Sequence, residues 1–258
     1  MEISGILNAV FRWLHIIAGV IWIGHLYFFN FVNIPFAAKM KEAGVGKTTV
    51  PELMPRALFW FRWGAAWTWI TGVLLLMLVF YMYSGVLFEA DHTWGPGAFV
   101  SLALVFGGVF IYDALYKSPL AQNVKVAHTV AFLLTAAVIL IMRYWAGFSY
   151  RGYEIHTGTM FGTAMAYNVW FLIWPAQQKI IAATKAGEAP DAAWLATAGS
   201  RSRHNTYMSV PLLFTMINQH TAATQFSSWG WIGLLVMILL GWHIVFHFYR
   251  KSLQVQGF

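Results

Sequence analysis

Residues 201–220, RSRHNTYMSVPLLFTMINQH, decide how the rest of the chain is interpreted. The stretch begins with two arginines and a histidine and ends on Asn218, Gln219 and His220. It is too polar to face lipid and too apolar to form a loop. Because polar groups inside a bilayer are costly, they usually face the interior of a helical bundle and mark a site. The stretch therefore predicts a membrane helix that is covered by other membrane helices.

The composition of the whole chain also indicates a membrane protein. Of its 258 residues, 59% are hydrophobic and 10% are charged, and the mean hydropathy is +0.62. The sequence has no cysteine, which excludes disulfides, thiolate-bound iron–sulfur clusters and haem attached through C-x-x-C-H. The net charge of +7 does not indicate nucleic acid, because basic residues of membrane proteins collect on the cytoplasmic side.

Seven hydrophobic runs are long enough to cross a bilayer, which takes about 20 residues. They predict an all-α bundle of about seven transmembrane helices in one polytopic membrane domain, residues 1–258. The first run has no basic segment before it and is too long for a signal peptide, so it is expected to be retained. The sixth run is the most polar and contains Pro211, which is expected to kink it. The runs are 7–34, 57–87, 97–116, 126–147, 155–176, 205–222 and 229–249.

The distribution of lysine and arginine between alternate connections predicts the orientation. Connections 37–56, 117–125, 177–203 and 250–258 hold twelve of these residues, whereas the opposite side holds only Arg12, Arg143 and Arg151. Since the basic side is cytoplasmic, the N-terminus is expected outside and the C-terminus in the cytoplasm. The twelve are Lys39, Lys41, Lys47, Arg56, Lys117, Lys125, Lys179, Lys185, Arg201, Arg203, Arg250 and Lys251.

With this orientation, the histidines of the spans fall into two depth layers, given a helical rise of about 1.5 Å per residue. Paired imidazoles from neighbouring helices are what haem b needs, because low-spin iron takes two axial nitrogen ligands. We therefore expect one or two haems b. The alternative for any single histidine is a hydrogen bond to a neighbouring helix. The outer layer is His15, His156 and His220, and the inner layer is His128, His204, His243 and His247.

Helical geometry limits how these histidines can pair. His204 and His220 lie about 160° apart on a straight helix, so one cofactor could use both only if Pro211 bends the segment. His243 and His247 share a face, so one could ligate iron while the other binds a propionate or water. His25 lies about 80° from His15 and is the weaker ligand candidate.

Four arginines are candidates for pairing with haem propionates through charge-assisted hydrogen bonds: Arg12, Arg62, Arg201 and Arg203. Arg201 and Arg203 could instead simply follow the positive-inside rule, and Arg12 could reach the interface. Arg62 lies inside a span, where Asp113 is a candidate partner. Gly158-x-x-x-Gly162 in the fifth run predicts a face for close helix packing.

Several separated motifs resemble, in order, the N-terminal transmembrane domain of the bacterial membrane-bound urate oxidases (urate hydroxylases). They are RWLHIIAGVIWIG at 12–24, WTWITG at 67–72, Tyr112-Asp113 through SPL at 118–120, IHTG at 155–158 through Asn168, PAQQK at 175–179 and RHN at 203–205 through NQH at 218–220. The resemblance covers most of the chain. The sequence departs from the family pattern at Gly64, where an acidic residue is expected.

The resemblance implies oxidation of urate, with electrons passed to a cytochrome c domain fused at the C-terminus. This sequence reaches Phe258 without a C-x-x-C-H motif, so the acceptor is expected to be a separate cytochrome c or a respiratory-chain subunit. The expectation is thus a haem b redox protein of the bacterial inner membrane. Two alternatives stay open: an enzyme that oxidises urate itself, and a cofactor-free accessory subunit or a membrane protein that handles copper or protons.

Overall fold

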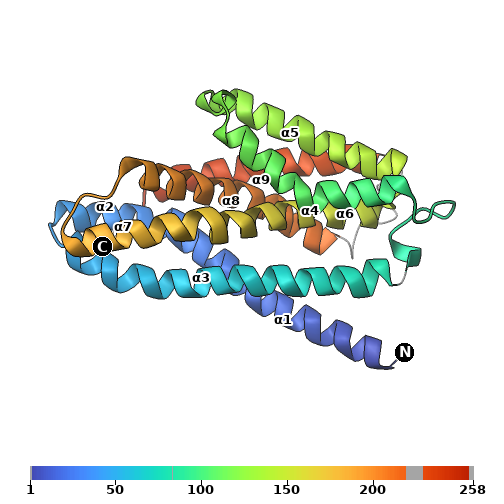
Figure 1. Ribbon diagram of the computed structural model, residues 1–258, viewed down its shortest axis with the longest axis horizontal. Coiled ribbons are helices and arrows are strands. Elements are labelled where there is room, and N and C mark those ends of the chain that lie inside the picture. The colour runs from blue at the N-terminus through green and yellow to red at the C-terminus, as the bar shows by residue number, and fades with distance from the viewer. Residues whose placement is uncertain (1, 83, 219–228, 256–258) are drawn as a thin grey trace. The chain divides into compact units, whose positions relative to one another are not determined.

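The structure is a computed structural model, and it describes residues 2–82, 84–218 and 229–255 (Figure 1). The described residues form long helices, several of which continue through a π-helical segment. The α-helices are α1 Glu2–Tyr27, α2 Ile34–Glu42, α3 Gly46–Leu76, α4 Pro96–Lys117, α5 Val124–Leu140, α6 Tyr150–Tyr167, α7 Trp174–Ala186, α8 Ala192–Asn218 and α9 Gly230–Ser252. The π segments are η1 Phe28–Asn33, η2 Met77–Tyr81, η5 Ile141–Trp145 and η6 Asn168–Ile173, and η3 Ser84–Val86 and η4 Pro119–Gln122 are short 3₁₀ turns.

The predicted class, an all-α membrane protein, is confirmed. In the described residues the one β feature is a bridge between Phe88 and Phe148. Five helical stretches among them are long and apolar enough to cross a membrane: Ile3–Glu42, Gly46–Tyr81, Pro96–Lys117, Val124–Trp145 and Gly230–Ser252. The predicted runs 155–176 and 205–222 fall on α6–α7 and on α8, which are helical but more polar, and residues 219–222 lie outside the description. The orientation stays a prediction.

The chain divides into two compact units. Unit 1 comprises Met1–Asn8, Gly72–Ala164 and Pro211–Leu240, and unit 2 comprises Ala9–Thr71, Met165–Val210 and Gly241–Phe258. Each unit has its own buried apolar residues. In unit 1 they include Leu87, Val105, Ile139, Met142 and Phe148, and in unit 2 they include Trp22, Leu26, Phe61, Ala65 and Val245.

Glycine allows close helix packing at particular points in both units. In unit 2, a Cβ on Gly64 would lie 3.0 Å from the backbone nitrogen of Trp22. That contact leaves no room at this position for the acidic side chain that the resemblance led us to expect. In unit 1, a Cβ on Gly162 would lie 3.3 Å from Leu212, and Gly158 lies against Thr215. The predicted packing face at Gly158 and Gly162 is therefore confirmed, with α8 as its partner.

A first prediction concerns the start of α4 in unit 1. A Cβ on Gly97 would lie 2.7 Å from the carbonyl oxygen of Trp145, and backbone cannot move aside as a flexible side chain can. Gly97→Ala is therefore expected to lower the free energy of unfolding by about 1–3 kcal/mol, measured by thermal melting in detergent. Gly107→Ala is the matched control on the same helix, because its Cβ meets nothing within 4 Å. Equal melting temperatures for the two variants would contradict this close approach of α4 to Trp145.

Candidate functional site

His156 of α6 is completely buried in unit 1, with 0% of its surface exposed. Its Nδ1 lies 2.7 Å from the carbonyl oxygen of Gly152, one turn earlier, and its Nε2 lies 2.9 Å from the hydroxyl of Tyr81. A carbonyl can only accept, so Nδ1 carries the hydrogen and Nε2 accepts from Tyr81 in the neutral ring. Nε2 is thus the nitrogen able to bind a metal, but in this geometry Tyr81 occupies it.

Aromatic rings enclose the His156 side chain. Phe148 lies 5.1 Å from it and Phe80 6.2 Å, measured between ring centroids, and Tyr81 is the last residue of the π segment η2. Single-turn π segments inside helices are frequent at functional sites because they redirect side chains. Here η2 ends on the residue that binds His156.

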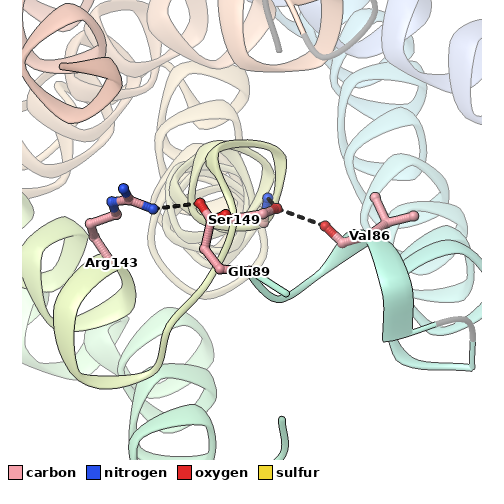
Figure 2. Close-up of polar contacts among 5 residues, drawn as sticks. Val86, Glu89, Arg143 and Ser149 are labelled. Carbon is pink, nitrogen blue, oxygen red and sulfur yellow. Dashed lines mark hydrogen bonds and ion pairs between the residues drawn. The ribbon is translucent and has the colours of Figure 1, made fainter. Parts of the chain in front are cut away.

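Hydrogen bonds and an ion pair fix the segment that carries Phe148 beside His156. The Ser149 hydroxyl donates to the carbonyl of Val86 at 2.7 Å, and Arg143 forms an ion pair with Glu89 at 2.5 Å (Figure 2). Backbone hydrogen bonds from Ser149 to Leu87 and from Glu89 to Gly147 run beside these contacts. Together they join the segment after η2 to the segment before α6, so the two walls around His156 are tied to each other.

His15 of α1 is half-buried in unit 2 and is held by another helix. Its Nδ1 lies 3.0 Å from the hydroxyl oxygen of Thr71, and that hydroxyl donates its own hydrogen to the carbonyl of Trp67 at 2.6 Å. Thr71 must therefore accept from His15, which places the hydrogen on Nδ1. The backbone carbonyl of Thr68, which lies 3.2 Å from the same hydroxyl, also contacts the ring from this side. With Nδ1 fixed, Nε2 is left over, which is the usual arrangement of a metal-binding histidine.

The histidines of the predicted inner layer differ from one another. His243 and His247 share an exposed face of α9, as predicted, and their Nε2 atoms are hydrogen-bonded to each other at 3.0 Å. His128 donates from Nδ1 to the carbonyl of Val124 at 2.7 Å, and its ring packs on Tyr116. His204 is half-buried on α8.

Two further histidines were considered in the sequence as possible ligands. His220, assigned to the outer layer, lies outside the described residues. His25, the weaker candidate, donates from Nδ1 to the carbonyl of Ile21 in its own helix. Within the described part of the chain, no three histidine, aspartate or glutamate side chains come together as a metal-binding group.

Two of the predicted propionate-binding arginines contact aromatic rings in unit 2. The guanidinium of Arg62 lies 4.0 Å from the ring centre of Trp174, and that of Arg203 lies 4.9 Å from the ring centre of Tyr249. Neither is in an ion pair with a described carboxylate, and Arg62 Nε is buried without a described hydrogen-bond partner. Asp113, the candidate partner of Arg62, forms its ion pair with Lys117 at 2.6 Å. Arg12 is half-buried on α1.

One face of the stretch 201–218 is buried, as its mixed polarity predicted, whereas Arg203, Leu213 and Ile217 are exposed. Asn205, Thr206, Ser209 and Thr215 have 0% of their surface exposed, and Arg201 has 5%. In unit 2, Ser202 and Asn205 contact asparagines from two π segments, and Ser209 contacts Tyr27. Their contacts are Asn30 Nδ2 to Ser202 Oγ at 2.8 Å, Asn168 Nδ2 to Asn205 Oδ1 at 2.8 Å, Tyr249 Oη to Asn30 Oδ1 at 2.8 Å and Tyr27 Oη to Ser209 Oγ at 3.0 Å.

The roles of Asn30 and Tyr249 in this amide network were missed in the sequence. The available signal was an asparagine inside the hydrophobic run 7–34, since such a group needs partners. The position of Asn30 in η1 and of Asn168 in η6 could not be anticipated, because π segments have no simple sequence pattern.

A second prediction tests this amide network. Asn205 accepts from Asn168 and donates to the carbonyl of Met165 at 3.0 Å, so both partners lose a bond in Asn205→Ala. Each buried polar group left unsatisfied costs about 1–3 kcal/mol, and the melting temperature is expected to fall accordingly. Ser200→Ala, at an exposed position of the same helix, is the control and is expected to leave the melting temperature unchanged. Similar stability of the two variants would argue against the network.

Long apolar helices, the buried imidazole of His156 and buried amide side chains are typical of a multi-pass membrane protein with polar groups among its helices. The family described as Urate oxidase N-terminal matches residues 2–257, and the chain belongs to this family. The predicted resemblance is thus confirmed over nearly the whole chain. No curated protein sequence and no solved structure matches the chain.

Proposed function

We propose that this urate-oxidase-like membrane protein binds haem b through histidines and moves electrons between a donor and a cytochrome c or respiratory-chain partner. Its proposed location is the bacterial inner membrane. The observation that carries the proposal is His15, whose Nδ1 is fixed by Thr71 from another helix, so that Nε2 is left to bind a metal. When bound, the haem iron would supply one-electron chemistry at a defined potential.

The residues of unit 2 fit the needs of a haem in two respects. Thr71 orients the His15 ring, and the Nδ1–H bond makes Nε2 a better donor to iron. Arg62 and Arg203 are held against aromatic rings without a described carboxylate, so each guanidinium can bind an anionic propionate. Arg12 is proposed, as before, to bind a haem propionate.

The other histidines differ in how readily their Nε2 atoms could bind iron. His156 could ligate iron only after the Tyr81 hydrogen bond is broken. In the same way, His243 or His247 must leave the other before its Nε2 can bind a metal. His128, His204 and His220 keep their proposed roles as ligands, and the experiment decides which of them bind.

The absorption spectrum of the purified chain, reduced minus oxidised, tests the proposal. Haem b is expected to give a sharp α band, and iron should be present in proportion to protein. A preparation grown with added haem precursor guards against incomplete loading. A spectrum without the α band under those conditions would end the haem assignment.

A second candidate, an enzyme that itself oxidises urate, is favoured by the family to which the chain belongs. Membranes that contain the protein would then consume urate, and His204→Ala would abolish that consumption. A third candidate, copper handling, is favoured by the His243 and His247 pair, whose Nε2 atoms are close enough to chelate one ion after small movements. Metal analysis that finds copper without iron would support it.

A further inference from the structure

Arg62 of α3 is a cation held among aromatic rings in unit 2. Its guanidinium carbon lies 4.0 Å from the ring centre of Trp174 and 5.9 Å from that of Trp170. A third ring, that of Phe59 on the preceding turn of α3, lies 5.8 Å away. The Trp170 indole nitrogen donates to the Arg62 carbonyl oxygen at 3.0 Å, which ties η6 to α3 beside the cation. Two separate segments of the chain therefore fix the position of this guanidinium.

No described carboxylate neutralises the charge of Arg62. The ion pairs in the described part of the chain join other residues, and Arg56, six residues earlier on α3, is paired with Glu52 at 2.7 Å. The Arg62 Nε is buried without a described hydrogen-bond partner, whereas its two terminal nitrogens are not among such buried atoms, and the residue as a whole is half-buried. Aromatic rings stabilise a cation but accept few of its hydrogens. The terminal nitrogens are thus the part of the group that a ligand from outside the chain can reach.

The exposed residues of α3 change character just before Arg62. Arg56 is exposed and charged, whereas Phe59, Trp60 and Trp63 are exposed and aromatic. Because tryptophan concentrates where lipid meets water, this change marks the boundary of the bilayer on α3. Arg62 lies about 9 Å beyond Arg56 along the helix, and a side chain as long as arginine can reach back from there to the headgroup layer.

The segment that packs on Arg62 shows the same change in the opposite chain direction. Phe171 of η6 is exposed and apolar, and Gln178 and Lys179 of α7 are exposed and polar. Trp174, whose ring covers Arg62, lies between them along the chain. Both segments therefore place Arg62 at the level where a bilayer presents its phosphate groups.

The phosphate of a phospholipid fits the chemistry of this point. A guanidinium can form two parallel hydrogen bonds to two phosphate oxygens. The exposed rings of Phe59, Trp60 and Trp63 offer an apolar surface for acyl chains on the same helix. Since no described carboxylate cancels the charge of Arg62, a lipid with a net negative charge is favoured over a zwitterionic lipid, whose own cation offsets its phosphate.

We propose that Arg62 is the headgroup site for an anionic phospholipid, whose phosphate oxygens accept from the terminal nitrogens while its chains lie on the exposed rings of α3. This inference goes beyond the proposed electron-transfer function and does not depend on it. A haem propionate is also an oxyanion, but the position of Arg62 at the bilayer boundary favours the lipid. The propionates are then left to the other candidate arginines.

Lipid retention by the full chain tests the site. The protein is reconstituted in nanodiscs with equal amounts of phosphatidylglycerol and phosphatidylcholine, transferred to detergent, and analysed by native mass spectrometry. The wild type is expected to keep phosphatidylglycerol in preference to phosphatidylcholine. Arg62→Gln keeps a long polar side chain without the charge, and it should retain about tenfold less phosphatidylglycerol, as for loss of hydrogen bonds to a charged group. Arg56→Gln is the control on the same helix, because Arg56 is exposed and paired with Glu52, and it should retain as much as the wild type.

Two outcomes would overturn the lipid site: equal retention of the two lipids by the wild type, and equal retention of phosphatidylglycerol by Arg62→Gln and Arg56→Gln. The first measurement needs no variant, so it holds even if Arg62→Gln affects folding. Arg62→Lys provides a second variant. It keeps the charge but cannot form the parallel pair of bonds, so its retention should fall between those of the wild type and Arg62→Gln.

The haem content of the same samples separates this proposal from the function proposed above. Loss of the α band in Arg62→Gln with unchanged lipid retention would assign the guanidinium to a propionate and overturn the lipid site. Loss of phosphatidylglycerol with an unchanged α band would support it. Preferential retention of phosphatidylglycerol by a wild type that shows no α band would contradict the haem assignment and leave the lipid site standing.

Discussion

His15→Ala is expected to lose the α band of reduced haem b while keeping its helical content. The expectation follows from the bonding of the ring, since Nδ1 donates to Thr71 and Nε2 is the nitrogen left to bind iron. Removal of an axial ligand from low-spin iron leaves an open coordination position, and haem retention is expected to fall by at least about tenfold, as for loss of even an outer-shell partner of a metal ligand. Haem per folded protein, from absorbance and circular dichroism, measures this.

His25→Ala is the matched control for this variant. His25 lies on the same helix with the same hydrogen position on its ring, but its Nδ1 is bound to its own helix at Ile21 instead of to another helix. It is expected to keep the α band. His15→Gly with added imidazole is expected to regain it, because free imidazole can occupy the position that the side chain has vacated.

Thr71→Val extends the same prediction beyond the ligand itself. Valine has the shape of threonine but cannot accept from His15 Nδ1, so the ring loses its fixed orientation. We expect haem affinity to fall by about 10–100-fold without loss of the fold. An unchanged α band in both His15→Ala and Thr71→Val would remove His15 from the proposed haem site.

The helices could be predicted from the sequence because long apolar runs leave few alternatives in a bilayer. The runs at 97–116 and 126–147 correspond closely to α4 Pro96–Lys117 and to α5 with η5, Val124–Trp145. The continuation of the first helix as far as Glu42 was not predicted, because the run ends at residue 34 while the backbone continues through η1 into α2. A hydrophobic run predicts only the part of a helix that lies in lipid. The helix itself continues for as long as its backbone hydrogen bonds do.

The candidate site was only partly predictable, because depth along a helix says nothing about the direction of a side chain. The seven histidines of the two layers were identified by depth, yet His243 and His247 face outward on α9 while His156 is enclosed by rings. The partners that decide the chemistry, Thr71 and Tyr81, come from distant segments, and the motif WTWITG at 67–72, which contains Thr71, does not indicate that its threonine binds His15. Tertiary structure is needed to find them.

His156→Ala and Tyr81→Phe are expected to destabilise unit 1 by different amounts and without additivity. Truncation of a buried ring costs about 3–5 kcal/mol, and His156→Ala also leaves the Tyr81 hydroxyl without its acceptor. Tyr81→Phe leaves His156 Nε2 buried without a donor, at a cost of about 1–3 kcal/mol. Since the two residues share one hydrogen bond, the double variant should cost less than the sum of the single variants. Chemical denaturation in detergent measures all three.

The haem α band of the same variants shows whether His156 ligates iron in addition to stabilising unit 1. If His156 also ligates iron, Tyr81→Phe should retain haem, because it frees Nε2, whereas His156→Ala should lose it. If the ring serves only to bind Tyr81, haem per folded protein should be equal in both variants and in the wild type. Tyr207→Phe is the control for a tyrosine hydroxyl elsewhere, since its ring stacks on Tyr249 in unit 2.

Strict additivity of the stability losses in the double variant would contradict the Tyr81–His156 hydrogen bond itself, since two residues that share a bond cannot lose it twice.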